Sequence, residues 1–274
     1  MAGSEAGAWA PHWDLHPSVA LGLVGLGALY LALGGRRAPP RRLFAYFASL
    51  AVLLVTLNGP VHDLADESLF SAHMVQHLIL SLVFPPLFLY GLPAWVVRPF
   101  LRPAGLLPLW RWVTRPAPAA AIFTVPIVFW HLPRFYDIAM RHHGWHIVQH
   151  LIFLATAVVM WWPVLAPVPE LPRASYPAQL LYLFLLGIPM SIVGAFITLA
   201  AAPLYPFYAA VPRLFGLSVM DDQQMGGLIM WVPGGLVFWI AMTVVWFRWS
   251  RRDEEAADRQ VPREAYAELP GVGG

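Results

Sequence analysis

The sequence predicts an all-α membrane protein folded as a bundle of seven transmembrane helices. Of its 274 residues, 59% are hydrophobic and only 12% are charged, which is too apolar for a soluble domain of this length. Seven apolar segments are each long enough to cross a bilayer core of roughly 30 Å as a helix. All 17 basic residues are arginine, and most of them fall between these segments. The pattern is that of a multi-pass membrane protein.

Each predicted span is a run of apolar residues bounded by polar residues, glycine or proline. We expect the spans near 17–35, 41–57, 68–90, 117–132, 144–166, 177–201 and 221–247. Pro85 and Pro86 should bend the third span, because proline removes a helical donor and clashes with the preceding turn. Residues 1–16 are expected to form an extracytoplasmic segment and residues 248–274 a cytoplasmic tail. From Arg251 onward this tail is predicted to be disordered, since it is charged and contains proline and glycine.

The arginines predict how the bundle is oriented. Twelve of them lie in the loops or helix ends on one side, whereas only Arg134, Arg141 and Arg213 lie on the other. By the positive-inside rule, the N-terminus is then outside and the C-terminus is in the cytoplasm. The long inner loop 91–116 carries three tryptophans, which predicts a stretch that lies along the membrane surface.

Two histidine pairs indicate the functional site. HMVQHLIL at 73–80 recurs as HIVQHLIF at 146–153, and each copy has two histidines four residues apart. On a helix such a pair shares one face, which is a chelating geometry. Ionisable side chains within a membrane span are costly and usually functional. The alternative is that these histidines form hydrogen bonds between helices. All ten histidines fall on the predicted outer side, which favours a site that opens outward.

The same spacing predicts an internal repeat of two helix hairpins. The offset of 73 residues that relates the pairs also relates Asn58 to His131 and Pro60 to Pro133. The second and third spans would then duplicate the fourth and fifth. A weaker similarity occurs in DDQQM at 221–225, where Gln224 takes the place of the glutamine within each pair.

If the third and fifth spans pack through these faces, their histidines form one metal site. The predicted ligands are His73, His77, His131, His146 and His150, with Asp222 and Met230 as weaker candidates. Imidazole donors without thiolate suit copper in either oxidation state, with zinc as the alternative, and the chain has no cysteine.

Other polar residues near the site have two interpretations each. Gln76 and Gln149 could fix the imidazole tautomers or join helices. Asp222, with Asp221, could instead cap the last helix, and methionine is also an ordinary core residue.

The histidines outside the pairs are weaker candidates. His142 and His143 are expected to be solvated or to line an uptake route, rather than to be buried ligands. His12, His16 and His62 are expected to be exposed loop residues.

Several functions do not fit the sequence. Histidines four apart on one helix point the same way, so they cannot bind one haem iron from opposite sides. The pairs lack the glutamate of HExxH proteases, and no P-loop, nucleophile elbow or dinucleotide motif is present. We therefore expect a protein that is not an enzyme. A net charge of +2 gives no indication of nucleic-acid binding.

Four motifs resemble those of a known family. HMVQH, WHLPRFYD at 130–137, HIVQHLIF followed by WWP at 161–163, and DDQQMGGLIMW at 221–231 are similar to the integral-membrane cytochrome c oxidase assembly factors called CtaG. The resemblance covers roughly 17–247. The family's motif positions correspond to His73, His77, His131, Pro133, Asp137, His146, His150, Asp222, Gln223 and Met230. An unrelated single-span copper chaperone shares the family name but uses cysteines, so nothing is transferred from it.

The resemblance implies a multi-pass protein of the bacterial plasma membrane that is needed to make an active caa3-type oxidase by helping copper reach it. The implied partners are cytochrome c oxidase subunits and an extracytoplasmic copper chaperone, with membrane lipid around the spans and no nucleic acid. The sequence does not predict the oligomeric state.

Three alternatives to copper binding during oxidase assembly remain open. A transporter of copper or another divalent ion would need polar residues throughout the cytoplasmic half, which has few. A chaperone for oxidase subunits that binds no metal would use the histidines in hydrogen bonds. A redox enzyme acting on a small molecule would use the same site.

Overall fold

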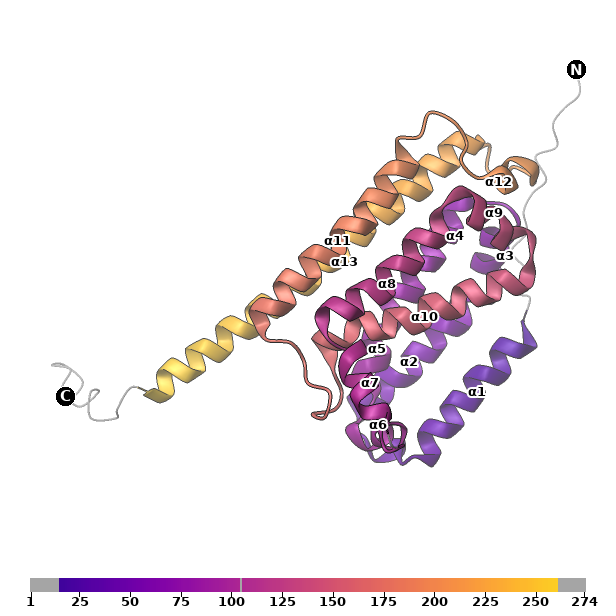
Figure 1. Cartoon of the computed structure of the whole chain (residues 1–274). Coiled ribbons are helices and arrows are strands. Elements are labelled where there is room, and N and C mark those ends of the chain that lie inside the picture. The colour runs from indigo at the N-terminus through magenta and orange to yellow at the C-terminus, as the bar shows by residue number, and fades with distance from the viewer. Residues whose placement is uncertain (1–14, 104, 261–274) are drawn as a thin grey trace, which may run out of the picture.

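The computed structural model describes residues 15–103 and 105–260, and within these ranges all regular secondary structure is helical (Figure 1). The long helices are α1 Pro17–Ala32, α2 Pro40–Thr56, α8 Pro116–His131, α10 His143–Leu165, α11 Tyr176–Thr198 and α13 Val219–Gln260. Another long segment consists of α4 Phe70–Leu78, a π-helical turn Ile79–Val83 and α5 Phe84–Gly91. The predicted all-α class is therefore confirmed.

A long helix lies at each of the seven predicted spans, but fewer than seven meet the requirements for crossing a membrane. Four are long and apolar enough by themselves: Phe70–Gly91, His143–Leu165, Tyr176–Thr198 and Val219–Arg259. Two bent pairs raise the number to six. α2 joins α3 Pro60–Glu67 at an angle of 45°, and α7 Leu106–Val113 joins α8 at 75°. α1 has only 16 residues. The described chain thus supports four to six spans, and the seventh span and the orientation stay predictions.

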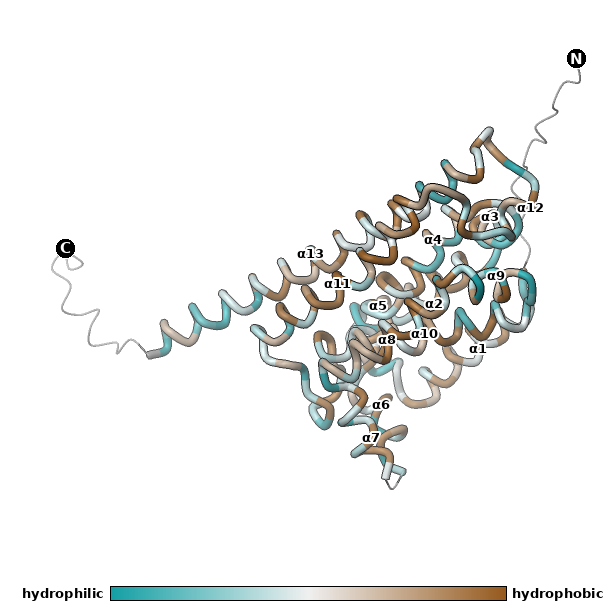
Figure 2. The backbone as a smooth tube through the Cα atoms, turned by 45° about the horizontal axis from the view of Figure 1, so that its top comes forward, coloured by the Kyte–Doolittle hydropathy of each residue, from teal (hydrophilic) through white to brown (hydrophobic). Residues whose placement is uncertain are grey.

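Short helices lie at the two ends of the bundle. Figure 1 shows α3, α9 Pro133–Arg141 and α12 Pro206–Ala210 at one end, and α6 Ala94–Leu101 and α7 at the opposite end. Figure 2 shows that apolar residues follow the long helices and that hydrophilic residues gather at α3 and α9. The loop 91–116, predicted to lie on the inner side, forms α6 and α7, and its Trp95 and Trp112 are exposed, as expected for a surface-lying stretch.

The element boundaries follow the offset of 73 residues. α3 begins at Pro60 and α9 at Pro133, while α4 begins at Phe70 and α10 at His143. Gly59 turns the chain before α3 with a φ of 71°, a value that favours glycine. The two hairpins therefore have the same layout of long helix, short helix and histidine-bearing helix. Their origin by duplication stays a prediction.

Packing compensates for proline within the third span. Pro85 has no backbone N–H, so it cannot bond to the carbonyl four residues earlier, at Ser81. Trp161 of α10 donates its indole N–H to this carbonyl over 3.0 Å. A neighbouring helix thus satisfies the backbone group that proline leaves free, as a membrane interior requires. The π-helical turn ends at Val83, two residues before Pro85.

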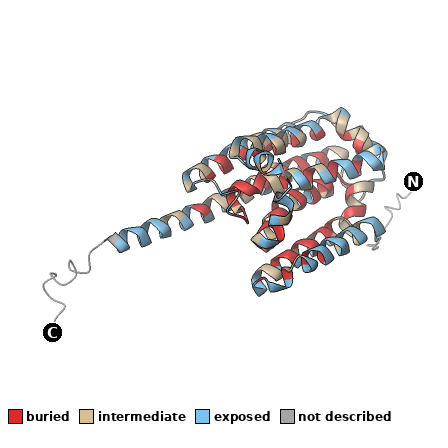
Figure 3. Cartoon of the chain, turned by 60° about the horizontal axis from the view of Figure 1, so that its bottom comes forward, coloured by how far each residue is buried: buried red, intermediate tan, exposed pale blue. Residues whose placement is uncertain are grey.

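Helices α11 and α13 pack closely against each other through small residues. A Cβ on Gly194 would lie 2.9 Å from the Trp231 Cβ, and one on Gly227 would lie 2.7 Å from the Thr198 amide nitrogen. Glycine therefore allows the two backbones to approach closely. Buried residues line the inward faces of the helices, whereas the far end of α13 is exposed (Figure 3).

Helix α13 extends farther than predicted. It continues beyond Arg251 to Gln260, so the first ten residues of the segment expected to be disordered are helical. Strong helix formers at 254–257 and contacts one turn apart explain the extension. Ser250 donates to Glu254 over 3.0 Å, and Arg259 pairs with Glu255. The remainder of the predicted tail, 261–274, and the predicted N-terminal segment through residue 14 lie outside the described residues.

Candidate metal centre

Five buried histidines from three helices meet near the end of the bundle that carries α3 and α9. His73 and His77 come from α4, His146 and His150 from α10, and His131 is the last residue of α8. The ring centre of His73 lies 5.1 Å from that of His146 and 5.8 Å from that of His150. The ring centre of His77 lies 5.4 Å from that of His150 and 5.7 Å from that of His131. The five residues are called the histidine cluster below.

Three members of the histidine cluster already have chelating spacing. His73, His146 and His150 each offer a ligand nitrogen, and these three atoms lie within 4.8 Å of one another. His77 and His73 share a hydrogen bond between their Nε2 atoms, which lie 2.7 Å apart. The arrangement thus combines a triad with two adjoining imidazoles, and all five histidines predicted as ligands take part in it.

Polar contacts at Nδ1 hold three of the rings so that Nε2 faces the cluster. Tyr208 of α12 lies 3.0 Å from His73 Nδ1 and donates its own proton to the Ala65 carbonyl, so its oxygen accepts from the imidazole. His131 Nδ1 donates to the Ile127 carbonyl over 2.7 Å. His146 Nδ1 lies 3.2 Å from Asp66 Oδ2.

The tyrosine that holds His73 keeps its proton. Tyr208 lies outside the long helices, and burial raises the pKa of its phenol well above the usual range. Its hydroxyl also lies 3.2 Å from that of Tyr136 on α9. A protonated phenol donating to Ala65 can accept from His73 throughout the neutral pH range.

Unsatisfied nitrogens show that the residues fit a metal ion. The Nε2 atoms of His131, His146 and His150 are buried without a hydrogen-bond partner among the described residues. Each buried polar atom without a partner costs about 1–3 kcal/mol. An ion coordinated by imidazole nitrogens would remove this cost, and copper and zinc are the ions that such donors suit.

Short helix α3 contributes two polar residues that sequence reasoning missed or misjudged. Asp66 contacts His146 and also lies 3.5 Å from His62. His62 was expected to be an exposed loop residue, but it is buried within α3. His16 is half-buried at the start of α1, and its ring centre lies 4.7 Å from that of His62. The spacing of four residues between His62 and Asp66 was the available signal.

The other predicted polar residues take different positions. Gln76 donates to the Thr56 carbonyl and contacts His62 Nδ1 at 3.0 Å, so it does not hold a paired histidine. Gln149 is buried, and neither polar atom of its side chain has a hydrogen-bond partner among the described residues. His142 and His143 are exposed, while His12 lies outside the described residues.

The two weaker ligand candidates have other contacts in the structure, and their role as ligands stays a prediction. Asp222 is buried, and its carboxylate accepts the backbone N–H groups of Phe70 and Ser71 and pairs with Arg213. The alternative for Asp222 was a cap on α13, but its carboxylate caps α4 instead, because α13 packs against the start of that helix. Met230 is buried in the main hydrophobic core, the ordinary role of methionine.

Other positions shared with the family's motifs hold the loops that cover the cluster. Pro133 begins α9. Asp137 accepts the backbone N–H of Phe207 over 2.8 Å, and the Gln223 side chain accepts that of Leu204 over 2.6 Å. These bonds fix α12 and thereby the position of Tyr208.

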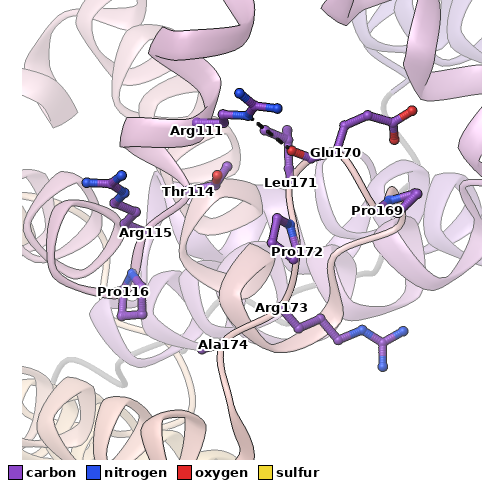
Figure 4. Close-up of a pocket in the computed structure, with 10 residues that line it drawn as sticks. All are labelled: Arg111, Thr114, Arg115, Pro116, Pro169, Glu170, Leu171, Pro172, Arg173 and Ala174. Atoms are coloured by element: carbon purple, nitrogen blue, oxygen red, sulfur yellow. Dashed lines mark hydrogen bonds between the residues drawn. The ribbon is translucent and has the colours of Figure 1, made fainter.

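A pocket of about 520 Å³ lies elsewhere, between the junction of α7 and α8 and the segment 169–174. Arg111, Arg115 and Arg173 surround it, and Arg111 bonds the Glu170 carbonyl (Figure 4). It belongs to the arginine-rich end of the bundle and contains no member of the histidine cluster.

Comparison with known proteins identifies the family. The chain is 25% identical to uncharacterized proteins of Mycobacterium bovis and Mycobacterium tuberculosis and 26% identical to one of Mycobacterium leprae. Each alignment of 266 residues covers 87% of this chain and 40% of the relative, so the chain spans about 40% of the length of these curated relatives. No solved structure is significantly similar to it. The family model for cytochrome c oxidase caa3 assembly factors matches residues 21–252, and the chain therefore belongs to the CtaG family of caa3 oxidase assembly factors.

Proposed function

We propose that this protein binds a copper ion in the histidine cluster, at the extracytoplasmic side of the bacterial plasma membrane, and passes it to cytochrome c oxidase during assembly. The observation that carries the proposal is the convergence of five buried imidazoles, three of which have a buried Nε2 without a hydrogen-bond partner in the described structure. Family membership supports the assembly role.

The donor set suits an ion that must be released again. Neutral imidazoles without thiolate accept both oxidation states of copper, and zinc is the alternative ion. Tyr208 and Asp66 hold His73 and His146 with Nε2 facing the cluster, so binding requires little rearrangement of these rings. Protons compete with the ion for the same nitrogens, and acidification should therefore release it.

Packing below the cluster favours exchange at one face over transport through the bundle. Phe153 packs against His77 with ring centres 4.8 Å apart, and Ala157 and Met160 follow on the same helix. All three side chains are fully buried and apolar. A cation moving inward along this face of α10 would lose its polar ligands, which is costly within a membrane.

The first experiment measures copper in the purified protein. His73→Ala/His77→Ala and His146→Ala/His150→Ala should each lose most of the copper bound per chain. His142→Ala/His143→Ala is the matched control, because it also removes two histidines but both are exposed. Zinc content measured in parallel identifies the preferred ion. Unchanged copper in both cluster variants would disprove the metal site.

A second experiment separates copper delivery from a chaperone role without metal. The same variants replace the native protein in cells. The copper content and the activity of the oxidase are then measured in isolated membranes. Delivery predicts that oxidase copper falls in the cluster variants while the variants still co-purify with oxidase subunits. Normal oxidase copper in cells with the metal-free variants would support the chaperone alternative.

A further inference from the structure

A second group of metal-binding side chains lies beside the histidine cluster. It consists of His62 and Asp66 on α3 and His16 at the start of α1. The ring of His62 stacks on that of His146, with centres 6.5 Å apart, and Asp66 Oδ2 lies 3.2 Å from His146 Nδ1. This second group, called the α3 group below, therefore adjoins the cluster through His146.

The α3 group offers two further atoms that could bind a metal ion. Asp66 Oδ1 and His16 Nε2 are both buried and lack a hydrogen-bond partner among the described residues. Within the part of the chain that the structure describes, the Asp66 carboxylate has no arginine partner; its ion-pair contacts are His62 at 3.5 Å and His146 at 3.2 Å. A carboxylate flanked by imidazoles, without a permanent positive charge against it, attracts cations.

The α3 group also connects the cluster with the surface. Asp66 contacts the cluster yet keeps 20% of its side chain exposed. Elsewhere, fully buried aromatic rings pack on the cluster: Tyr136 lies 5.5 Å from His73, and Phe153 lies 4.8 Å from His77. An ion approaching from solvent therefore meets polar ligands along α3, whereas buried aromatic rings cover the sides of the cluster formed by Tyr136 and Phe153.

We propose that His16, His62 and Asp66 form an outer cation site that takes up the copper ion before it moves to the histidine cluster through His146. The inference rests on the proposed function, because it assigns the uptake route of the same ion. Carboxylate and imidazole donors bind the ion less tightly than the imidazoles of the inner site, so transfer proceeds inward. Asp66 has two roles, since it also orients His146.

The test measures how fast the purified full-length chain takes Cu(I) from a chromogenic chelator. His16→Ala/His62→Ala should slow loading at least about tenfold, the scale of electrostatic and local-concentration effects at charged clefts. Its final copper content should equal that of the wild type, because the cluster is intact. Asp66→Asn should slow loading and also weaken binding, since His146 loses the carboxylate that orients it.

Glu67→Gln is the matched control for Asp66→Asn, because it removes one negative charge from the exposed neighbouring position on α3. Its loading rate should match that of the wild type. If His16→Ala/His62→Ala does not fold, His62→Gln serves instead, since its amide oxygen can still accept from Gln76.

The outcomes separate the two proposals. Wild-type loading rates in the His62 variants and in Asp66→Asn would overturn the outer site while the copper centre stands. A wild-type protein that takes up no copper would overturn both. Slow loading with full final content in the histidine variants supports the outer site.

Discussion

Replacing Asp222 with alanine should destabilise the protein severely, because this residue joins α13 to the start of α4. Its carboxylate accepts the backbone N–H of Phe70 at 2.9 Å and that of Ser71 at 3.0 Å. It also accepts the Ser71 hydroxyl at 2.6 Å and pairs with Arg213 at 3.2 Å. The variant leaves three donors without their acceptor at a buried helix start.

The magnitude follows from these contacts. A buried donor left unsatisfied costs about 1–3 kcal/mol, and loss of a helix cap typically about 1 kcal/mol. Water entering the site and the partly exposed Arg213 will recover part of this loss. We therefore expect about 3–5 kcal/mol in total, similar to the cost of breaking a buried ion pair. For a chain of this size, the thermal midpoint should fall by on the order of 10 °C.

Thermal unfolding in detergent, followed by circular dichroism, measures this change. Asp221→Ala is the control, because Asp221 is exposed and accepts only the hydroxyl of Ser218 among the described contacts. The control should shift the midpoint by a few degrees at most. Copper bound per folded chain should stay normal in Asp222→Ala. Equal midpoints in the two variants would contradict the capping role, and selective loss of copper from a stable variant would make Asp222 a ligand.

Three further predictions follow from the geometry. Tyr208→Phe removes the oxygen that accepts from His73, so copper affinity should fall about 10–100-fold in a chelator competition, and unchanged affinity would contradict the positioning role. Burial raises the pKa of Tyr208, so its contribution to stability is complete below about pH 10, the unfolded value, and is lost at about 1.4 kcal/mol per pH unit above it. Unfolding midpoints measured from pH 8 to 12 test this, and Tyr208→Phe should reduce the slope. Gly227→Ala should destabilise by about 1–3 kcal/mol because a Cβ would lie 2.7 Å from the Thr198 backbone, whereas Gly235→Ala, which meets nothing within 4 Å, should stabilise slightly. Similar midpoints for the two glycine variants would show that the helix contact is looser than described.

The long helices could be predicted because their signal is local. An apolar run of about 20 residues must form its own hydrogen bonds in lipid, and each predicted span coincides with a long helix. The bends were harder to predict. The break before α3 depends on a positive φ at Gly59, and the extension of α13 depends on helical pairs that charge alone does not reveal.

The histidines of the site could be identified for the same reason, but their surroundings could not. Spacing of four residues identifies two pairs, and the 73-residue offset adds His131. Tyr208 is 135 residues from His73 in sequence, and Asp66 is 80 residues from His146, so only tertiary packing brings them together. The contacts of Asp222 could not be predicted, because its partners on α4 lie about 150 residues away.

The far end of α13 is continuous with a helix long and apolar enough to span the membrane, so the two move as one rigid rod. Residues 248–260 add about 20 Å to the span at 1.5 Å per residue, with no loop between. A tilt of the span by about 10° would move the far end sideways by about 3–4 Å over that length. A change in the tilt of α13 would therefore reach both the end at residues 248–260 and α4, the helix that α13 packs against and that carries His73 and His77.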